Sequence, residues 1–101
     1  MNRYYILDGE TPIPLSDYEW EEWRGVRRHI IRNTDLLGGE VSTIFLGINH
    51  NYAEPSDPIL FETMVFGGDL DGTQERYRTY EEAIAGHAEM IEKVERVRVI
   101  D

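Results

Sequence analysis

Residues 41–68 read VSTIFLGINHNYAEPSDPILFETMVFGG, and the rest of the chain is organised around this stretch. It contains two apolar runs, 41–48 and 59–66, that are rich in β-branched and aromatic residues. Runs of this kind favour β-strands when turn-forming residues bound them. The polar connection between them is longer than a tight hairpin turn, and Gly67-Gly68 closes the second run. The stretch therefore predicts two strands joined by a long loop, and such loops often carry function.

Both predicted strands have apolar residues on both faces, because successive side chains of a strand point to opposite sides. In the first run, one face carries Val41, Thr43 and Phe45, and the other carries Ile44, Leu46 and Ile48. In the second run, one face carries Ile59, Phe61, Thr63 and Val65, and the other carries Leu60, Glu62, Met64 and Phe66. We therefore expect these to be the central strands of a sheet that is at least partly covered on both sides.

The N-terminus predicts a small hairpin. Residues 4–7 form a short apolar run, and Asp8-Gly9 is a strong turn dipeptide after which the chain can return beside the run. Pro12 and Pro14 cannot donate backbone hydrogen bonds, so the returning segment is expected at an edge.

A helix is expected to begin at Ser16. Ser16 and Glu19 have the spacing of a capping box, and Leu15 and Trp20 occupy the two positions of a hydrophobic staple. Gly25 is expected to loosen or end this helix, and residues 27–32 then pass into a strand-like segment.

The C-terminal third predicts a short strand at 76–78 and a helix that runs to about Val97, opened by a second capping box at Thr79 and Glu82. The helix has one expected core stripe and a second, shallower apolar face. The stripe comprises Tyr80, Ile84, His87, Ala88, Ile91 and Val94, and the shallower face comprises Ala83, Gly86 and Met90. Glycine inside a helix costs roughly 1 kcal/mol relative to alanine, so Gly86 indicates either close approach by another backbone or a tolerated weakness.

Together these elements predict an α+β fold, with a mainly antiparallel sheet of about four strands and two helices. At 101 residues, the chain is long enough for one hydrophobic core, so we expect one compact domain spanning residues 1–101.

Composition narrows the function classes. The chain has no cysteine, which excludes disulfides, thiolate zinc sites and a cysteine nucleophile. Its N-terminus lacks a signal-peptide pattern, and no apolar run approaches the roughly 20 residues that span a bilayer, so we expect a soluble cytoplasmic protein. A net charge of −10 opposes direct binding to nucleic acid or an anionic membrane. It suits docking on a basic surface, although the charge could also serve solubility alone.

Four blocks carry a resemblance that covers nearly the whole chain. They are YYILDGE near the start, VSTIFLGINH, PILFETMVFGG and RYRTYEEAIAGHAEM. In these blocks the chain resembles a family of small, uncharacterised proteins encoded by tailed bacteriophages and prophages. The resemblance implies a phage accessory gene product expressed in the cytoplasm of a bacterial host, and it brings no catalytic residues with it.

Three residues could form a metal or acid–base site. His50 follows the first central strand, Glu62 lies in the second and His87 lies in the terminal helix. Two imidazoles and a carboxylate suit a divalent metal with an open coordination position, or proton transfer near neutral pH. The alternative is that the histidines are structural and hydrogen-bonded, and no recognised motif such as HExxH supports the site.

One basic cluster could hold an anion. Arg24, Arg27, Arg28 and Arg32 lie close in sequence, and arginine forks bind phosphate in a bidentate manner. Trp20 and Trp23 could stack on a nucleotide base, although packing against the sheet would also explain them. The alternative for the arginines is pairing with the acidic residues of 17–22.

These observations favour a non-enzymatic phage accessory protein that binds a host or anti-phage defence component, in counter-defence or host takeover. One alternative is a protein that sequesters a small anionic, nucleotide-like signal through the arginine cluster. The other is a metal-assisted enzyme that uses His50, Glu62 and His87. No cofactor is predicted, and a homodimer could form through the Ala83, Gly86 and Met90 side of the last helix.

Overall fold

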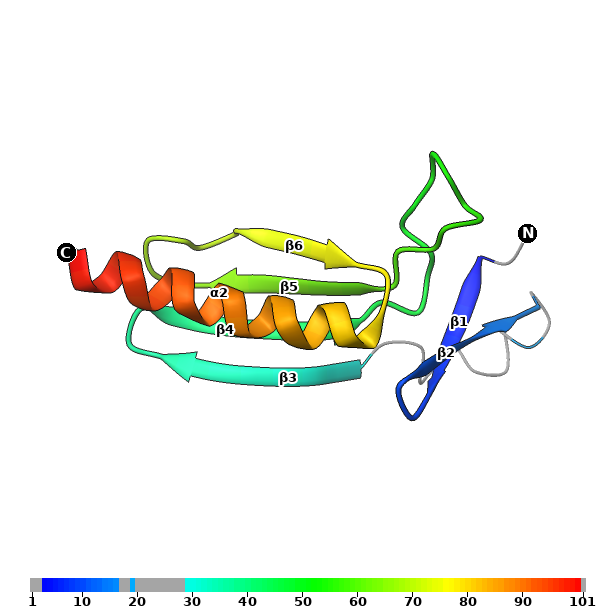
Figure 1. Cartoon of the computed structure of the whole chain (residues 1–101), viewed down its shortest axis with the longest axis horizontal. Coiled ribbons are helices and arrows are strands. Elements are labelled where there is room, and N and C mark those ends of the chain that lie inside the picture. The colour runs from blue at the N-terminus through cyan, green and yellow to red at the C-terminus, as the bar shows by residue number, and fades with distance from the viewer. Residues whose placement is uncertain (1–2, 17–18, 20–28, 101) are drawn as a thin grey trace.

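The computed structural model describes residues 3–16, 19 and 29–100, with the side chains of 98–100 left out (Figure 1). The described elements are β1 (Tyr4–Asp8), β2 (Thr11–Leu15), β3 (His29–Leu36), β4 (Gly39–Phe45), β5 (Phe61–Phe66), β6 (Gln74–Tyr77) and α2 (Tyr80–Ile100). The expected α+β class and antiparallel pairing are confirmed, but the expected count of about four strands is wrong: within the described residues, six strands form two sheets. None of the described helices is long and apolar enough to cross a membrane.

The larger sheet is an antiparallel meander in the order β3-β4-β5-β6, so β4 and β5 are central, as predicted. Val41 pairs with Val65, Thr43 with Thr63 and Phe45 with Phe61, and all six side chains are buried on the same face. Figure 1 shows α2 lying across this face, which we call the inner face.

The prediction of which side of α2 faces the core is only partly confirmed: His87 and Val94 of the predicted stripe are buried against the sheet, but so are Ala83, Gly86 and Met90 of the face expected to be shallower. Ala88, which the predicted stripe included, is exposed. Both sides of α2 are apolar, and the small side that includes Ala83 and Gly86 allows the helix to approach the sheet closely. The face suggested for a homodimer is therefore occupied by the protein's own sheet.

The core divides into two clusters along the helix. Near the C-terminal end of α2, Val41 and Val65 pack with Met90 and Val94. Near its N-terminal end, Phe45, Leu60, Phe61 and Ala83 pack together, with Tyr77 among the half-buried residues around them. His87 lies between the two clusters in sequence and is itself 2% exposed.

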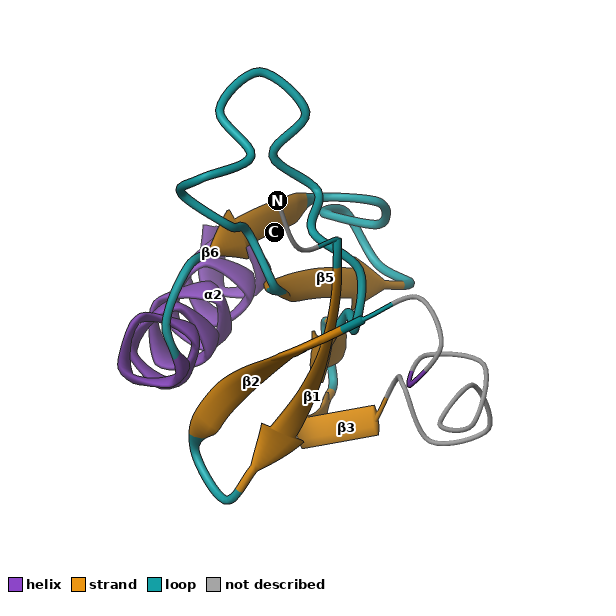
Figure 2. Cartoon of the chain, turned by 90° about the vertical axis from the view of Figure 1, so that its right-hand side faces the viewer, coloured by secondary structure: helices purple, strands orange, loops and turns teal. Residues whose placement is uncertain are grey.

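The predicted N-terminal hairpin is present as a separate two-stranded sheet at one end of the larger one (Figures 1 and 2). Its backbone joins the segment that follows β4: the Tyr5 N–H donates to the Gly47 carbonyl at 2.9 Å, and the Asn49 N–H donates to the Arg3 carbonyl at 2.8 Å. This pairing explains why β4 ends at Phe45, although apolar residues continue to Ile48.

Both capping boxes are confirmed. The Ser16 N–H donates to Glu19 Oε1 at 3.0 Å and the Glu19 N–H donates to Ser16 Oγ at 3.2 Å, contacts that lower the pKa of Glu19. The rest of the helix predicted after Ser16 lies outside the described residues. At the start of α2, Thr79 and Glu82 exchange the same pair of bonds at 3.0 and 3.1 Å.

Candidate functional site

A row of polar side chains crosses the inner face beneath α2. His87 Nδ1 lies 2.7 Å from Thr43 Oγ1, and His87 Nε2 lies 2.9 Å from Thr34 Oγ1. Thr43 Oγ1 in turn lies 2.5 Å from Thr63 Oγ1. The strand register positions these hydroxyls. Thr43 of β4 directly opposes Thr63 of β5, and Thr34 of β3 opposes Val41, which lies two residues from Thr43 on the same face of β4. The row therefore links β3, β4, β5 and α2 at one level of the sheet.

The tautomer of His87 determines which partner donates in each hydrogen bond that the ring makes. A neutral imidazole has one N–H donor and one acceptor nitrogen. If Nδ1 accepts from Thr43, then Nε2–H donates to Thr34 and Thr43 accepts from Thr63. In the other tautomer, Nδ1–H donates to Thr43 and Nε2 accepts from Thr34. Each arrangement satisfies both imidazole nitrogens, so the neutral ring fits the core without an unpaired polar atom.

The surroundings of His87 keep the ring neutral near pH 7. Burial lowers the pKa of His87 below its ordinary value, and the positive charge of Arg32 lowers it further. A general base must reach a substrate proton, yet His87 is 2% exposed and both its nitrogens are engaged. The row is therefore best explained as a structural network of the core.

Tyr77 lies beside this row with an unusual hydroxyl. The hydroxyl is buried and has no hydrogen-bond partner among the residues that the structure describes. Burial raises the pKa of Tyr77, and the negative charges of Glu75 and Glu89 raise it further. The nearby Thr63 hydroxyl opposes this rise, although it does not reach hydrogen-bonding geometry. The ring packs directly over Gly86, where a Cβ would overlap it. Gly86 thus admits a side chain from β6, not the backbone considered from sequence.

The structure gives the predicted metal site no support. His87 lies on the inner face, whereas Glu62 lies on the opposite face and accepts a bond from Arg76 Nε at 3.0 Å. His50 lies in the loop after β4, where its Nδ1 is 2.8 Å from the Ile48 carbonyl oxygen. Among the described residues, no group of three or more histidine, aspartate or glutamate side chains could hold a metal ion.

Most of the predicted anion site falls outside the described residues, namely Trp20, Trp23, Arg24, Arg27 and Arg28. Arg32 is described: it is exposed in β3 and pairs in register with Thr43. Its side chain therefore belongs to the inner side of the sheet, consistent with its effect on the pKa of His87.

The opposite face of the larger sheet presents a different surface, which we call the open face. Its apolar residues are Ile30, Ile44, Met64 and Phe66, and its charged residues are Asp35, Glu40, Glu62 and Arg76. Ile30 is 63% exposed and Phe66 is 48% exposed. Figures 1 and 2 place α2 on the other side of the sheet. The apolar residues on both faces of the central strands predict at least partial cover on both sides, but no described helix covers this face.

The loop at 46–60 projects from the body of the protein (Figures 1 and 2) and is highly organised. The buried side chain of Asn49 accepts from the N–H groups of Asn51 at 2.8 Å and Ile59 at 3.1 Å, and donates to the Pro55 carbonyl at 2.9 Å. Tyr52, which is 72% exposed, is therefore presented from a well-bonded loop.

Sequence reasoning missed the threonine–histidine row and the open face. Thr43 and Thr63 at matching positions of otherwise apolar strand faces were the available signal for the row. The open face had a signal in Glu62, a charged residue in a central strand. Comparisons of the chain with protein-family models, with curated proteins and with solved structures found no match.

Proposed function

We propose that the protein acts by binding another protein through the open face of its four-stranded sheet. The observation that carries this proposal is the exposure of Ile30 and Phe66 at opposite corners of that face, with Ile44 and Met64 half-buried between them. A sheet normally buries its apolar face against another layer. Apolar residues rimmed by charged ones are typical of protein interaction sites.

The charge of the open face favours a basic partner. Asp35, Glu40 and Glu62 contribute three carboxylates, whereas Arg76 contributes one cation and is already bonded to Glu62. A second copy of the chain would bring the same excess of negative charge to the interface, in addition to a net charge of −10 per chain. Opposite charge instead speeds association and disfavours wrong partners.

The setting proposed for this binding follows from the resemblance to phage proteins. The partner would be a component of the bacterial host or of an anti-phage defence system, met in the host cytoplasm. An acidic protein that covers a basic surface can block what that surface ordinarily holds. This mode of action requires no catalytic residue of the chain.

The test is capture from host lysate with charge-inserting variants. We expect Ile30→Glu or Phe66→Glu to weaken retention of a specific partner at least tenfold, because a carboxylate would be placed inside an apolar contact. Ile13→Glu is the matched control, since Ile13 is an exposed isoleucine of the separate β1–β2 sheet. Circular dichroism would verify that all three variants are folded.

Two results would contradict the proposal. One is recovery of a partner that binds the wild type and both open-face variants equally. The other is the absence of any specific partner from lysates of susceptible hosts. Loss of binding in the Ile13→Glu control alone would show that the interface lies on the hairpin instead.

A further inference from the structure

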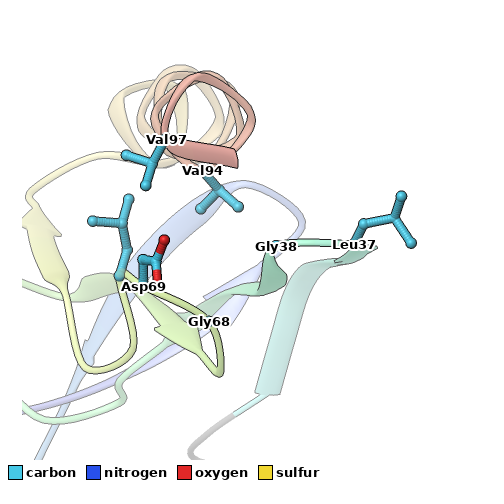
Figure 3. A pocket seen from close by; sticks show the side chains of 7 residues that line it. Leu37, Gly38, Gly68, Asp69, Val94 and Val97 are labelled. Carbon is cyan, nitrogen blue, oxygen red and sulfur yellow. The ribbon is translucent and has the colours of Figure 1, made fainter. Parts of the chain in front are cut away.

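A small pocket lies at the end of the sheet away from the hairpin, beside the last turns of α2 (Figure 3). Its volume is about 230 Å³. It is lined by Leu37, Gly38, Gly68, Asp69, Leu70, Val94 and Val97. In Figure 3 the valines of α2 lie above Asp69, whose carboxylate points toward them, and Leu37 points away. The pocket thus has apolar walls and one charged group.

The floor of this pocket is fixed by contact between two turns. Gly38 lies in the β3–β4 turn and Gly39 begins β4, whereas Gly67 and Gly68 follow β5. A Cβ on Gly68 would overlap the Gly38 carbonyl, and a Cβ on Gly39 would lie 2.7 Å from the Gly67 carbonyl oxygen. Glycine also permits the positive φ of 74° at Gly68. Because the backbones touch, the pocket is formed before any ligand arrives.

The electrostatics of the pocket favour a cation. The carboxylate of Asp69 is exposed and makes no hydrogen bond or ion pair with another described residue. Val97 belongs to the last turn of α2, and the C-terminal end of a helix carries partial negative charge. The whole chain adds a net charge of −10. An anionic ligand would be repelled by all three sources.

The small volume of the pocket and its apolar walls indicate which kind of cation fits. Pockets for whole small-molecule ligands usually measure about 300–1,000 Å³, so this one is small for that role. Its apolar walls suit an aliphatic chain, and long basic side chains combine such a chain with a terminal charge. We infer that the pocket receives an alkyl chain ending in a cation, supplied by a lysine or arginine side chain of the protein partner. The source of the cation, though not its chemistry, rests on the proposed function.

The chemistry can be tested on the free protein, without any partner. Methyl resonances of Leu70, Val94 and Val97 would be followed by NMR during titration with n-butylammonium, n-propylguanidinium, n-butanol or butyrate. We expect both cations to bind about threefold to fivefold more tightly than butanol, which is the upper part of the range of an exposed ion pair, and butyrate to bind most weakly. Asp69→Asn should remove the preference for cations. Asp8→Asn, which removes an exposed carboxylate from the other end of the protein, should leave it intact.

Equal binding of butanol and the cations would overturn the inference, as would no binding of any probe. An equal effect of Asp69→Asn and Asp8→Asn would show a general effect of net charge and would also overturn it. A blocked lysine, N-acetyl-lysine methylamide, distinguishes a side chain of a protein partner from a free small cation. Shifts of the same methyl resonances on its addition support a side chain of a partner. Binding of free butylammonium without the blocked lysine would overturn that assignment. None of these results depends on the open-face variants, so the two proposals can fail separately.

Discussion

Replacing Gly86 with alanine should destabilise the protein, although the same change stabilises most helices. Gly86 lies inside α2, is buried and faces Tyr77 of β6. A Cβ built on Gly86 overlaps not only the Tyr77 hydroxyl but also ring atoms Cζ and Cε1. The end of a flexible side chain could move aside, but overlap with the ring requires the whole tyrosine to shift.

The expected magnitude follows from two opposing contributions. Alanine is favoured over glycine in a helix interior by about 1 kcal/mol. Overpacking a core costs about 1–3 kcal/mol, and overlap with ring atoms suggests the upper half of that range. If the Tyr77 ring instead moves out, it loses its contacts with the cluster around Phe45 and Phe61. The net change in the free energy of unfolding should therefore be a loss of about 1–2 kcal/mol.

Urea denaturation followed by far-UV circular dichroism measures this change, and a double-mutant cycle identifies its cause. In a Tyr77→Ala background the ring is absent, so Gly86→Ala should stabilise by about 1 kcal/mol. Ala88→Gly, at an exposed position of the same helix, measures the intrinsic helix term and should destabilise by about 1 kcal/mol. If Gly86→Ala stabilises the wild type as much as the Tyr77→Ala variant, the close contact does not exist and the reasoning is refuted.

Three further predictions concern the polar groups. The pKa of His87 is lowered in the folded protein, so just below pH 6.5 the unfolded chain gains a proton at this site and the folded protein does not. The free energy of unfolding should therefore fall toward pH 5, by at most about 1.4 kcal/mol per pH unit. This fall should be steeper in the wild type than in His87→Gln, when both are measured by urea denaturation. Asn49→Ala should cost about 1–3 kcal/mol in a denaturation experiment and speed hydrogen exchange at the Ile59 amide; unchanged exchange would contradict the role of Asn49 in the loop. Thr79→Ala should lower the free energy of unfolding by about 1 kcal/mol in urea denaturation. Thr79→Ser should lower it much less, because the serine hydroxyl still accepts from the Glu82 N–H.

The sequence predicts elements that depend on local chemistry. The two central strands follow from alternation in residues 41–48 and 59–66, and the start of α2 follows from the Thr79–Glu82 pair. The hairpin follows from the Asp8-Gly9 turn, where Gly9 adopts a φ of 64°. Each of these signals acts over a few residues, so it indicates an element without knowledge of distant contacts.

Features that depend on tertiary contact could not be predicted. The rotation of α2 was ambiguous because both of its sides are apolar, and the decision rests on the approach of Tyr77 to Gly86 from another strand. The end of β4 depends on backbone bonds from the N-terminal hairpin. For the candidate sites, residue type suggested that His50, Glu62 and His87 could meet, but strand parity places Glu62 opposite the face that His87 contacts.

Strand parity also separates stability from the proposed binding. In β5 the odd-numbered residues, such as Thr63 and Val65, are buried under α2, while the even-numbered residues, such as Met64 and Phe66, belong to the open face. Neighbouring residues should therefore respond in different assays. Substitutions at Thr63 should change the free energy of unfolding through the His87 row, and charge insertion at Phe66 should change partner binding with little effect on folding. The helix face is satisfied by the chain itself, so a partner that the protein recognises through this sheet must meet the other face.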